Sequence, residues 1–288
     1  MPDPVLLLKA IALAAAACGV IIGIARRSGR VGGAIGAALG AMAGAWMLGL
    51  ASHVPPRDAL EKFLLVLLPV VAVADAIPHR WTRTTLRLGV AAAAVPLLIH
   101  GSSYVTDLFG PGSREWSVGR TVSMEAGLGF ALFLAWTAVT RLAERSGRSM
   151  AIAVSGTSAV AGITVMLSGY ASGGQWGLAL AAIAGVLALV GGRHPGAGIG
   201  VVLVGLFGLL AAGWLFAGLA PLNGALLFAA PLLAWLPESL PVGPRMRAGL
   251  RVGLTAVPVA VVLFAAQQKF VRDSAGPSPG EASVDDYR

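Results

Sequence analysis

Ten long runs of apolar residues limit the folds open to this chain more than any other feature of its sequence. In the hydrocarbon core of a bilayer every backbone amide must find its hydrogen-bond partner within the protein, and a helix of about 20 apolar residues meets this requirement while crossing it. The runs do not alternate polar and apolar residues as membrane β-strands do. We therefore expect an all-α fold, a polytopic transmembrane helical bundle of about ten spans with short loops. The expected spans are 5–25, 31–51, 60–77, 86–100, 121–140, 149–170, 175–192, 197–217, 221–237 and 249–268.

The overall composition agrees with a chain embedded in a bilayer. Of its 288 residues, 57% are hydrophobic and 12% are charged, whereas soluble proteins carry about a quarter charged residues. We expect residues 1–271 to form a single transmembrane helical domain. Residues 272–288 are rich in proline, glycine, serine and acidic residues, so we expect a disordered polar C-terminal tail. Similar stretches around Pro96 and Pro231, in the fourth and ninth expected spans, leave a 5+5 internal repeat open.

The basic residues fall in alternate connections between the expected spans, and this pattern predicts the orientation. The formal net charge of +8 would favour a nucleic-acid partner in a soluble protein. Here the arginines orient the helices, so we expect no nucleic acid. The positive-inside rule places the arginine clusters in the cytoplasm and both termini on the extracytoplasmic side. The abundance of Arg, Ala and Gly is typical of proteins from GC-rich bacterial genomes, so we expect a location in the plasma (inner) membrane of a bacterium. The clusters are Arg26, Arg27 and Arg30; Arg80, Arg83 and Arg87; Arg141, Arg145 and Arg148; Arg193; and Arg245, Arg247 and Arg251.

The sequence contains no recognisable catalytic or cofactor-binding motif. Cys18 is the only cysteine, which excludes disulfides within the chain and cysteine-based metal sites. The four histidines lack the spacing of a zinc-binding HExxH motif. The glycines of 196–200 open a span instead of following a strand, which argues against a phosphate-binding loop. We therefore predict no catalytic residue, no metal and no cofactor.

Four glycines at intervals of four residues line one face of the second expected span: Gly32, Gly36, Gly40 and Gly44. A face without side chains lets another helix approach closely, so dispersion contacts and weak hydrogen bonds can hold the pair. We interpret the stripe as a helix-packing surface. The alternative is a sliding interface in a transporter. Besides the lipid bilayer, the possible partners of this glycine stripe are a helix of another protein and a second copy of the chain.

Two ionisable residues lie about one turn inside expected spans from the same side. They are Lys9 in the first span and Glu125 in the fifth. An ion pair between them would offset much of the cost of removing both charges from water. Alternatively, Lys9 extends to the membrane surface and Glu125 reaches water or Arg120.

Asp75 lies near the cytoplasmic end of the third expected span. His79 follows four residues later, so the two share a helix face unless Pro78 breaks the helix. A carboxylate beside an imidazole can shuttle a proton. The alternative is an ion pair between Asp75 and Arg80, Arg83 or another cytoplasmic arginine.

A polar patch, Ser155-Gly156-Thr157-Ser158, interrupts the sixth expected span. Local unwinding there would expose backbone groups to a substrate near the middle of the membrane, as in many transporters. The alternative is ordinary packing, with the hydroxyl groups bonded to carbonyl oxygens of the preceding turn.

These features favour a small-solute transporter or permease. The substrate-pathway or proton-relay candidates are then Glu125, Asp75, His79, Lys9, Ser155, Thr157 and Ser158. The alternative is a non-catalytic membrane subunit or scaffold that packs against partner helices, which the glycine stripe favours. A membrane-embedded enzyme is a third hypothesis, with the outer residues His53, Asp58, His100, Asp107 and Glu115 as its only material.

Overall fold

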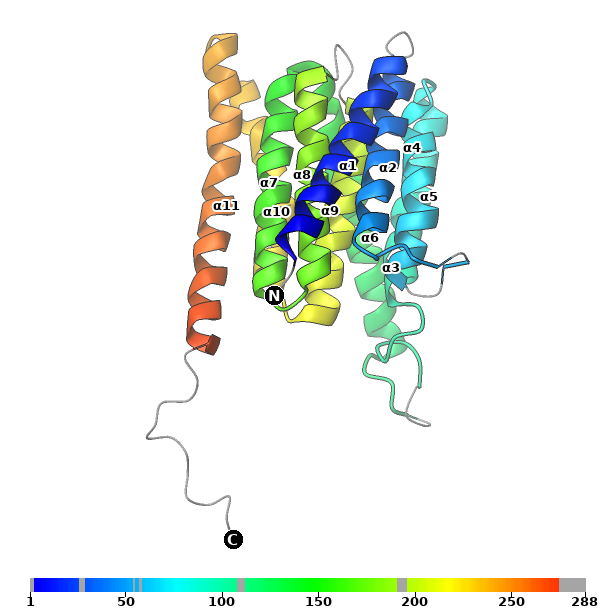
Figure 1. Ribbon diagram of the computed structural model, residues 1–288. Helices are drawn as coiled ribbons and strands as arrows, with labels where there is room; N and C mark the ends of the chain where they lie inside the picture. Colours follow the sequence, from blue (N-terminus) through cyan, green and yellow to red (C-terminus); the bar gives the residue numbers. More distant parts are fainter. Residues whose placement is uncertain are drawn as a thin grey trace.

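The computed structural model describes residues 3–25, 29–53, 55–56, 59–107, 112–190 and 196–274, and within them every regular element is helical (Figure 1). The helices run roughly parallel or antiparallel to one another and are joined by short connections (Figure 1). Their bounds are α1 Pro4–Ile24, α2 Arg30–Met47, α3 Ala59–Lys62, η2 Phe63–Leu67, α4 Leu68–Ala76, α5 Arg80–Ile99, α6 Val118–Ser146, α7 Arg148–Leu167, α8 Ala171–Val190, α9 Gly196–Ala217, α10 Pro221–Ala229, η3 Ala230–Ser239 and α11 Pro244–Ser274.

Seven of the described helices are long and apolar enough to cross a membrane: α1, α5, α6, α7, α8, α9 and α11. The expectation of an all-α membrane protein is confirmed to this extent. Each of the ten expected spans coincides with helix, but the number of ten crossings is not confirmed. The shorter cases have physical reasons, because α2 is diluted by glycine and two other stretches are interrupted near prolines.

Two prolines change the helix type where they occur. The helix α4, which contains Pro69, is preceded by a π-helical turn, η2, at Phe63–Leu67. Proline has no N–H and its ring clashes with the carbonyl group four residues earlier, so the turn before it deforms. Pro231 lies at the start of the 3₁₀ segment η3. Pro96 and Pro258, by contrast, lie within α5 and α11, which continue past them.

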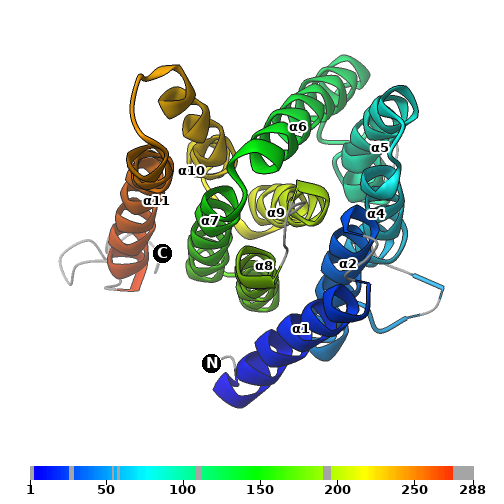
Figure 2. The same cartoon turned by 90° about the horizontal axis from the view of Figure 1, so that it is seen from above.

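The most buried helix is α9, which lies at the centre of the bundle. It packs against α2, α4, α6, α7 and α8, which surround it in the view along the bundle (Figure 2). The peripheral helices α1 and α11 instead expose large apolar side chains, among them Leu8 and Val20 on α1 and Val261 and Phe264 on α11. A soluble protein rarely exposes so much apolar surface. This combination is that of a membrane-embedded helical bundle.

The glycine stripe of α2 packs against helices of the same chain. A Cβ at Gly36 would lie 3.0 Å from the Cys18 carbonyl oxygen of α1, and one at Gly40 would lie 2.7 Å from the Ala14 carbonyl oxygen. At Gly44 the nearest atom is the Ala179 Cβ of α8, at 3.0 Å. The stripe is therefore already covered, so a foreign helix would have to use another surface.

One end of the bundle collects most of the described arginines, and we call it the arginine-rich end. There α2, α5, α7 and α11 begin and α6 ends, and a glycine with a positive φ of 56°, Gly147, turns the chain from α6 into α7. A residue without a Cβ adopts this backbone conformation at least cost. Arg26, Arg27, Arg193 and the predicted disordered tail from residue 275 onward lie outside the described residues. Within the tail's predicted range, α11 extends to Ser274.

Candidate functional site: two charged clusters at the arginine-rich end

Asp75 forms the centre of a sealed charged cluster. Its side chain is fully buried in the last turn of α4. Arg87 of α5, itself only 4% exposed, donates to Oδ1 from Nε at 3.0 Å and from Nη2 at 2.5 Å. Trp136 of α6 donates to Oδ2 from Nε1 at 3.1 Å, and the Arg87 guanidinium also lies 5.0 Å from the centre of that indole ring. The carboxylate thus joins three helices.

Arg30, Glu144 and Arg83 extend this cluster towards the surface. Arg30 donates from Nε to the Asp75 backbone carbonyl oxygen at 3.1 Å and forms an ion pair with Glu144. Arg83 Nη1 lies 3.6 Å from the Glu144 carboxylate. Because the Glu144 side chain is 35% exposed, water can screen these outer charges as it cannot screen Asp75.

The predicted Asp75–His79 face does not form. The helix α4 ends at Ala76, and His79 serves as the N-cap of α5, where its Nδ1 lies 3.1 Å from Thr82 Oγ1. Pro78 lies between the two helices, so the chain follows the alternative in which this proline breaks the helix. Asp75 instead pairs with Arg87, one of the arginines that the sequence predicts to be cytoplasmic.

Sequence reasoning missed the glycines that make room for this cluster at the start of α9. A Cβ at Gly200 would lie 1.8 Å from Asp75 Oδ2 and 2.4 Å from Trp136 Nε1. A Cβ at Gly196 would lie 2.8 Å from Glu144 Cγ. The G-A-G-I-G string therefore spaces α9 against charged side chains of its neighbours. Alternating glycines at the start of an otherwise apolar helix were the available signal.

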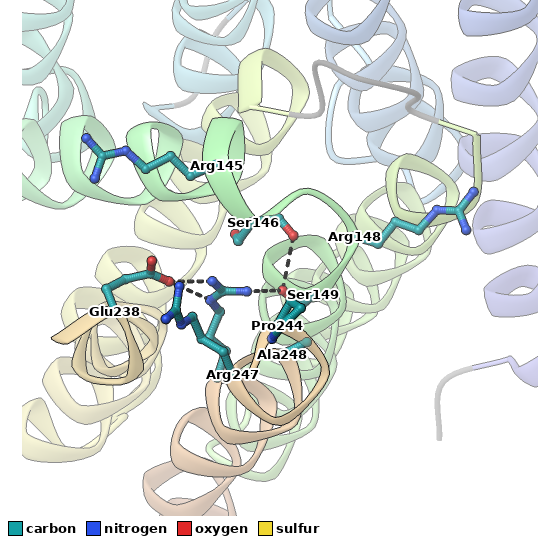
Figure 3. Close-up of a pocket in the computed structure, with 9 residues that line it drawn as sticks. Arg145, Ser146, Arg148, Ser149, Glu238, Pro244, Arg247 and Ala248 are labelled. Atoms are coloured by element: carbon teal, nitrogen blue, oxygen red, sulfur yellow. Dashed lines mark hydrogen bonds and ion pairs between the residues drawn. The ribbon is translucent and has the colours of Figure 1, made fainter. Parts of the chain in front are cut away.

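The second cluster lines an open pocket between the end of η3 and the starts of α7 and α11 (Figure 3). The pocket has a volume of about 490 Å³. At its buried side Arg251 donates from Nε to Glu238 at 2.8 Å and from Nη1 to Ser149 Oγ at 3.1 Å. Arg247 also lines it, and donates from Nη2 to the carbonyl oxygens of the chain just before α11. We call it the Arg247–Arg251 pocket.

This pocket carries an excess of positive charge. Its lining includes four arginines, with Arg145 and Arg148 in addition to the two already named, and one carboxylate, that of Glu238. Arg145 and Arg148 are exposed and extend outward on either side in Figure 3. The pocket also adjoins the N-terminus of α7, where no side chain caps the first turn. A helix N-terminus presents free N–H groups and a partial positive charge, both of which favour an anion.

Lys9 and Glu125 are not brought together. Lys9 is exposed on α1, which packs against α2 and α8, whereas Glu125 is half-buried on α6, which packs against α5 and α9. No ion pair joins them among the described residues. The alternative in which each reaches water or the membrane surface agrees with this arrangement.

The Ser155–Ser158 patch lies within an unbroken helix. The helix α7 is regular from Arg148 to Leu167, so the patch is not unwound. Ser155 donates to the Ala181 carbonyl oxygen of α8 at 2.8 Å, and Thr157 donates to the carbonyl oxygen one turn earlier at 2.9 Å. Ser158 is fully buried and its hydroxyl has no hydrogen-bond partner among the described residues. The patch packs α7 against α8.

Three of the five residues considered for an enzyme have separate structural partners. His53 Nδ1 lies 2.8 Å from the buried carboxylate of Glu61, Asp107 accepts from the Arg114 backbone N–H, and Glu115 accepts from a serine in the same loop. Asp58 lies outside the described residues. His100 ends α5 and is exposed. Among the described residues no three metal-ligating side chains gather.

The loop before α6 closes the opposite end of the bundle. The Tyr104 hydroxyl donates to the Leu215 carbonyl oxygen of α9 at 2.5 Å, and its ring lies 4.7 Å from that of the buried Trp116. Burial raises the pKa of the Tyr104 hydroxyl above its ordinary value, and the negative charge of Glu115 raises it further. The hydroxyl therefore stays protonated and able to donate.

Comparisons with known proteins assign no family to this architecture. No protein-family model matches the chain, and neither the curated proteins nor the solved structures contain a significant match to it. The fold and the two clusters define it as a helical membrane protein with most of its described arginines at one end.

Proposed function

We propose that the protein is a small-solute transporter of the bacterial plasma membrane whose Asp75–Arg87 pair takes part in the transport cycle. The observation that carries the proposal is a charged pair sealed inside an apolar bundle. Removing two charges from water costs free energy that apolar packing of the same volume would avoid. Ionisable groups kept within membrane helices at such a cost often lie on ion or substrate pathways.

The pair is placed where a change of charge would alter helix packing. Asp75 holds α4 to α5 through Arg87 and α4 to α6 through Trp136. Protonation of Asp75 would cancel its attraction for Arg87 and loosen α5 from α4. The π turn of η2 lies in the same helical stretch, and such turns bend more easily than regular helix. Proton binding could thereby favour a second arrangement of these helices.

The proposed topology has ten crossings. It counts α2, the α3–η2–α4 stretch and the α10–η3 stretch as spans in addition to the seven long helices. The arginine-rich end then faces the cytoplasm, as the positive-inside rule requires. Residues 3 and 274 both lie on the extracytoplasmic side. Accessibility of single cysteines placed in successive connections, in a Cys18→Ala background, tests this arrangement.

Flux measurements on the reconstituted protein test the transport proposal. Proteoliposomes with a pH-sensitive dye inside receive pools of sugars, amino acids and small carboxylates. The wild type is expected to acidify or alkalinise the lumen with at least one pool, and Asp75→Asn is expected to abolish that signal. Glu125→Gln changes a carboxylate that has no ion-pair partner among the described residues. It is the matched control and is expected to retain the signal. A signal that survives Asp75→Asn removes the pair from the mechanism.

A non-catalytic membrane subunit is the second candidate, and the apolar centre of the bundle favours it. The central helix α9 carries no ionisable side chain, so the middle of the fold offers little to a polar solute. Purification from native membranes separates the two candidates. A partner recovered in fixed stoichiometry, together with no flux for any pool, supports the subunit. Since the α2 stripe is covered within the chain, such a partner would contact the outer faces of α1 or α11.

A further inference from the structure

We infer that the Arg247–Arg251 pocket binds a phosphate-bearing anion, for which the acidic phospholipids of the surrounding leaflet are the nearest source. The inference does not depend on transport. It starts from the size of the pocket, since about 490 Å³ lies within the range of small-molecule sites, about 300–1,000 Å³. A phosphate group with a glycerol backbone fits such a volume.

The charge of the lining selects an anion. Four arginines and one carboxylate line the pocket, which leaves a formal excess of three positive charges. Glu238 is the one group that repels an anion, and its charge is already held by Arg251 through an ion pair and a hydrogen bond. Arginine forks match the geometry of phosphate oxygens and bind them through paired, charge-assisted hydrogen bonds.

Unused hydrogen-bond donors belong to residues that line the pocket. Arg247 Nε is buried without a hydrogen-bond partner among the described residues. Leaving such a donor unpaired costs roughly 1–3 kcal/mol, so a ligand oxygen that accepts from it after the Arg247 side chain turns toward the pocket gains stability. The uncapped first turn of α7 supplies further N–H groups beside Ser149. These donors come from α7 and α11, so a bound phosphate would bridge two helices.

The surroundings of the pocket suit an amphiphile. Leu236, Leu240 and Met246 expose apolar side chains close to it along the chain, with exposures of 55%, 43% and 61%. Acyl chains can lie against these residues while the headgroup reaches the arginines. Basic pockets between membrane helices on the cytoplasmic side are a known mode of headgroup binding.

Titration of the purified full chain in a neutral detergent tests the inference. Phosphatidylglycerol binding is followed by native mass spectrometry, with phosphatidylcholine as the zwitterionic control, and glycerol 3-phosphate binding is followed by calorimetry. Arg247→Gln is expected to weaken the bound anion about tenfold, the effect of losing a charged donor. Arg245→Gln removes the same charge from the neighbouring turn but lies outside the pocket lining, and is expected to change affinity less than twofold.

Each outcome either decides whether the pocket binds an anion or identifies the source of that anion. Binding of phosphatidylglycerol alone, weakened by Arg247→Gln, assigns the pocket to lipid headgroups, and binding of glycerol 3-phosphate as well assigns it to soluble phosphate esters. If Arg247→Gln does not fold, Arg148→Gln, which changes an exposed residue, replaces it. Its affinity for the anion is expected to fall two- to fivefold. Equal losses for the Arg245 and pocket variants, or binding of neither anion, would overturn the inference.

Discussion

The two charged clusters use the same residue types at the same end of the bundle, yet they differ in how they meet water. Asp75 is fully buried, and its carboxylate accepts hydrogen bonds from Arg87 and Trp136. The backbone of α9 at Gly200 packs directly against the same carboxylate. The Glu238 side chain is 21% exposed and borders a pocket of about 490 Å³. One cluster is closed, and the other is open.

The charge balance of the clusters differs in the same sense. At the buried centre one arginine faces one carboxylate, so the charges cancel, whereas the lining of the pocket holds four arginines and one carboxylate. Buried charge must be neutralised locally because the surrounding medium screens it poorly. Charge near water can remain in excess and attract a ligand. The closed cluster therefore holds helices together, and the open one is suited to binding.

The largest expected effect is the loss of Arg87. Arg87→Gln leaves the Asp75 carboxylate buried without its cation, and we expect the free energy of unfolding to fall by about 3–5 kcal/mol. The measurement is equilibrium unfolding in detergent or lipid bicelles. The double variant Asp75→Asn/Arg87→Gln removes both charges and is expected to recover most of the loss. A double variant as unstable as the single one would contradict the charge argument and indicate a loss of packing.

Gly200→Ala tests the closed cluster from its other side. The added methyl group would lie 1.8 Å from Asp75 Oδ2 and 2.4 Å from Trp136 Nε1, so α9 must shift or the Trp136 hydrogen bond must break. We expect a loss of about 2–3 kcal/mol from strain and the broken bond. Gly156→Ala in α7, where a Cβ would meet nothing within 4 Å, is the matched control and should be neutral or slightly stabilising. Equal stability of the two variants would show that the cluster is not tightly closed.

Arg251→Gln removes the cation that pairs with the carboxylate of the open cluster, as Arg87→Gln does in the closed cluster. Glu238 loses its partner but can gain water from the pocket, so we expect a smaller loss, about 1–2 kcal/mol. Unfolding of both single variants under the same conditions gives the comparison directly. A loss as large as that of Arg87→Gln would mean that the pocket is dry and that the distinction between closed and open clusters fails.

The sequence predicted the helical stretches well because a bilayer-spanning helix leaves a local signal, a run of apolar residues. Three of the ten expected spans do not form helices long and apolar enough to count as crossings by length and composition, for reasons that depend on the fold. Gly32–Gly44 lowers the apolarity of α2 because that helix packs closely inside the bundle, and Pro69 and Pro231 interrupt two others. The helix at each position was predictable, but its regularity was not.

For the site, the sequence identified Asp75 but not its partner. A carboxylate in an apolar run is visible without a structure, whereas the choice of Arg87 over its neighbours depends on the break at Pro78 and on how α5 packs against α4. From the sequence, Arg247 and Arg251 indicate only the orientation of the helices. Two arginines four residues apart lie on one helix face, and that spacing was the signal for a facing site. Their partner Glu238 becomes a neighbour only through the fold.

The smallest expected effect lies at the exposed edge of the closed cluster. Glu144→Gln removes the charge that pairs with Arg30 and faces Arg83, but the Glu144 side chain is 35% exposed and water compensates for most of the loss. We expect a change of about 0.5 kcal/mol at low ionic strength. Near 1 M salt the screening length falls to about 3 Å, so this difference from the wild type should vanish, whereas that of Arg87→Gln should persist. Thermal unfolding of both variants at low and high salt measures the contrast. An equal salt dependence for the two would mean that solvent reaches Asp75, and the cluster would then have to be regarded as open throughout.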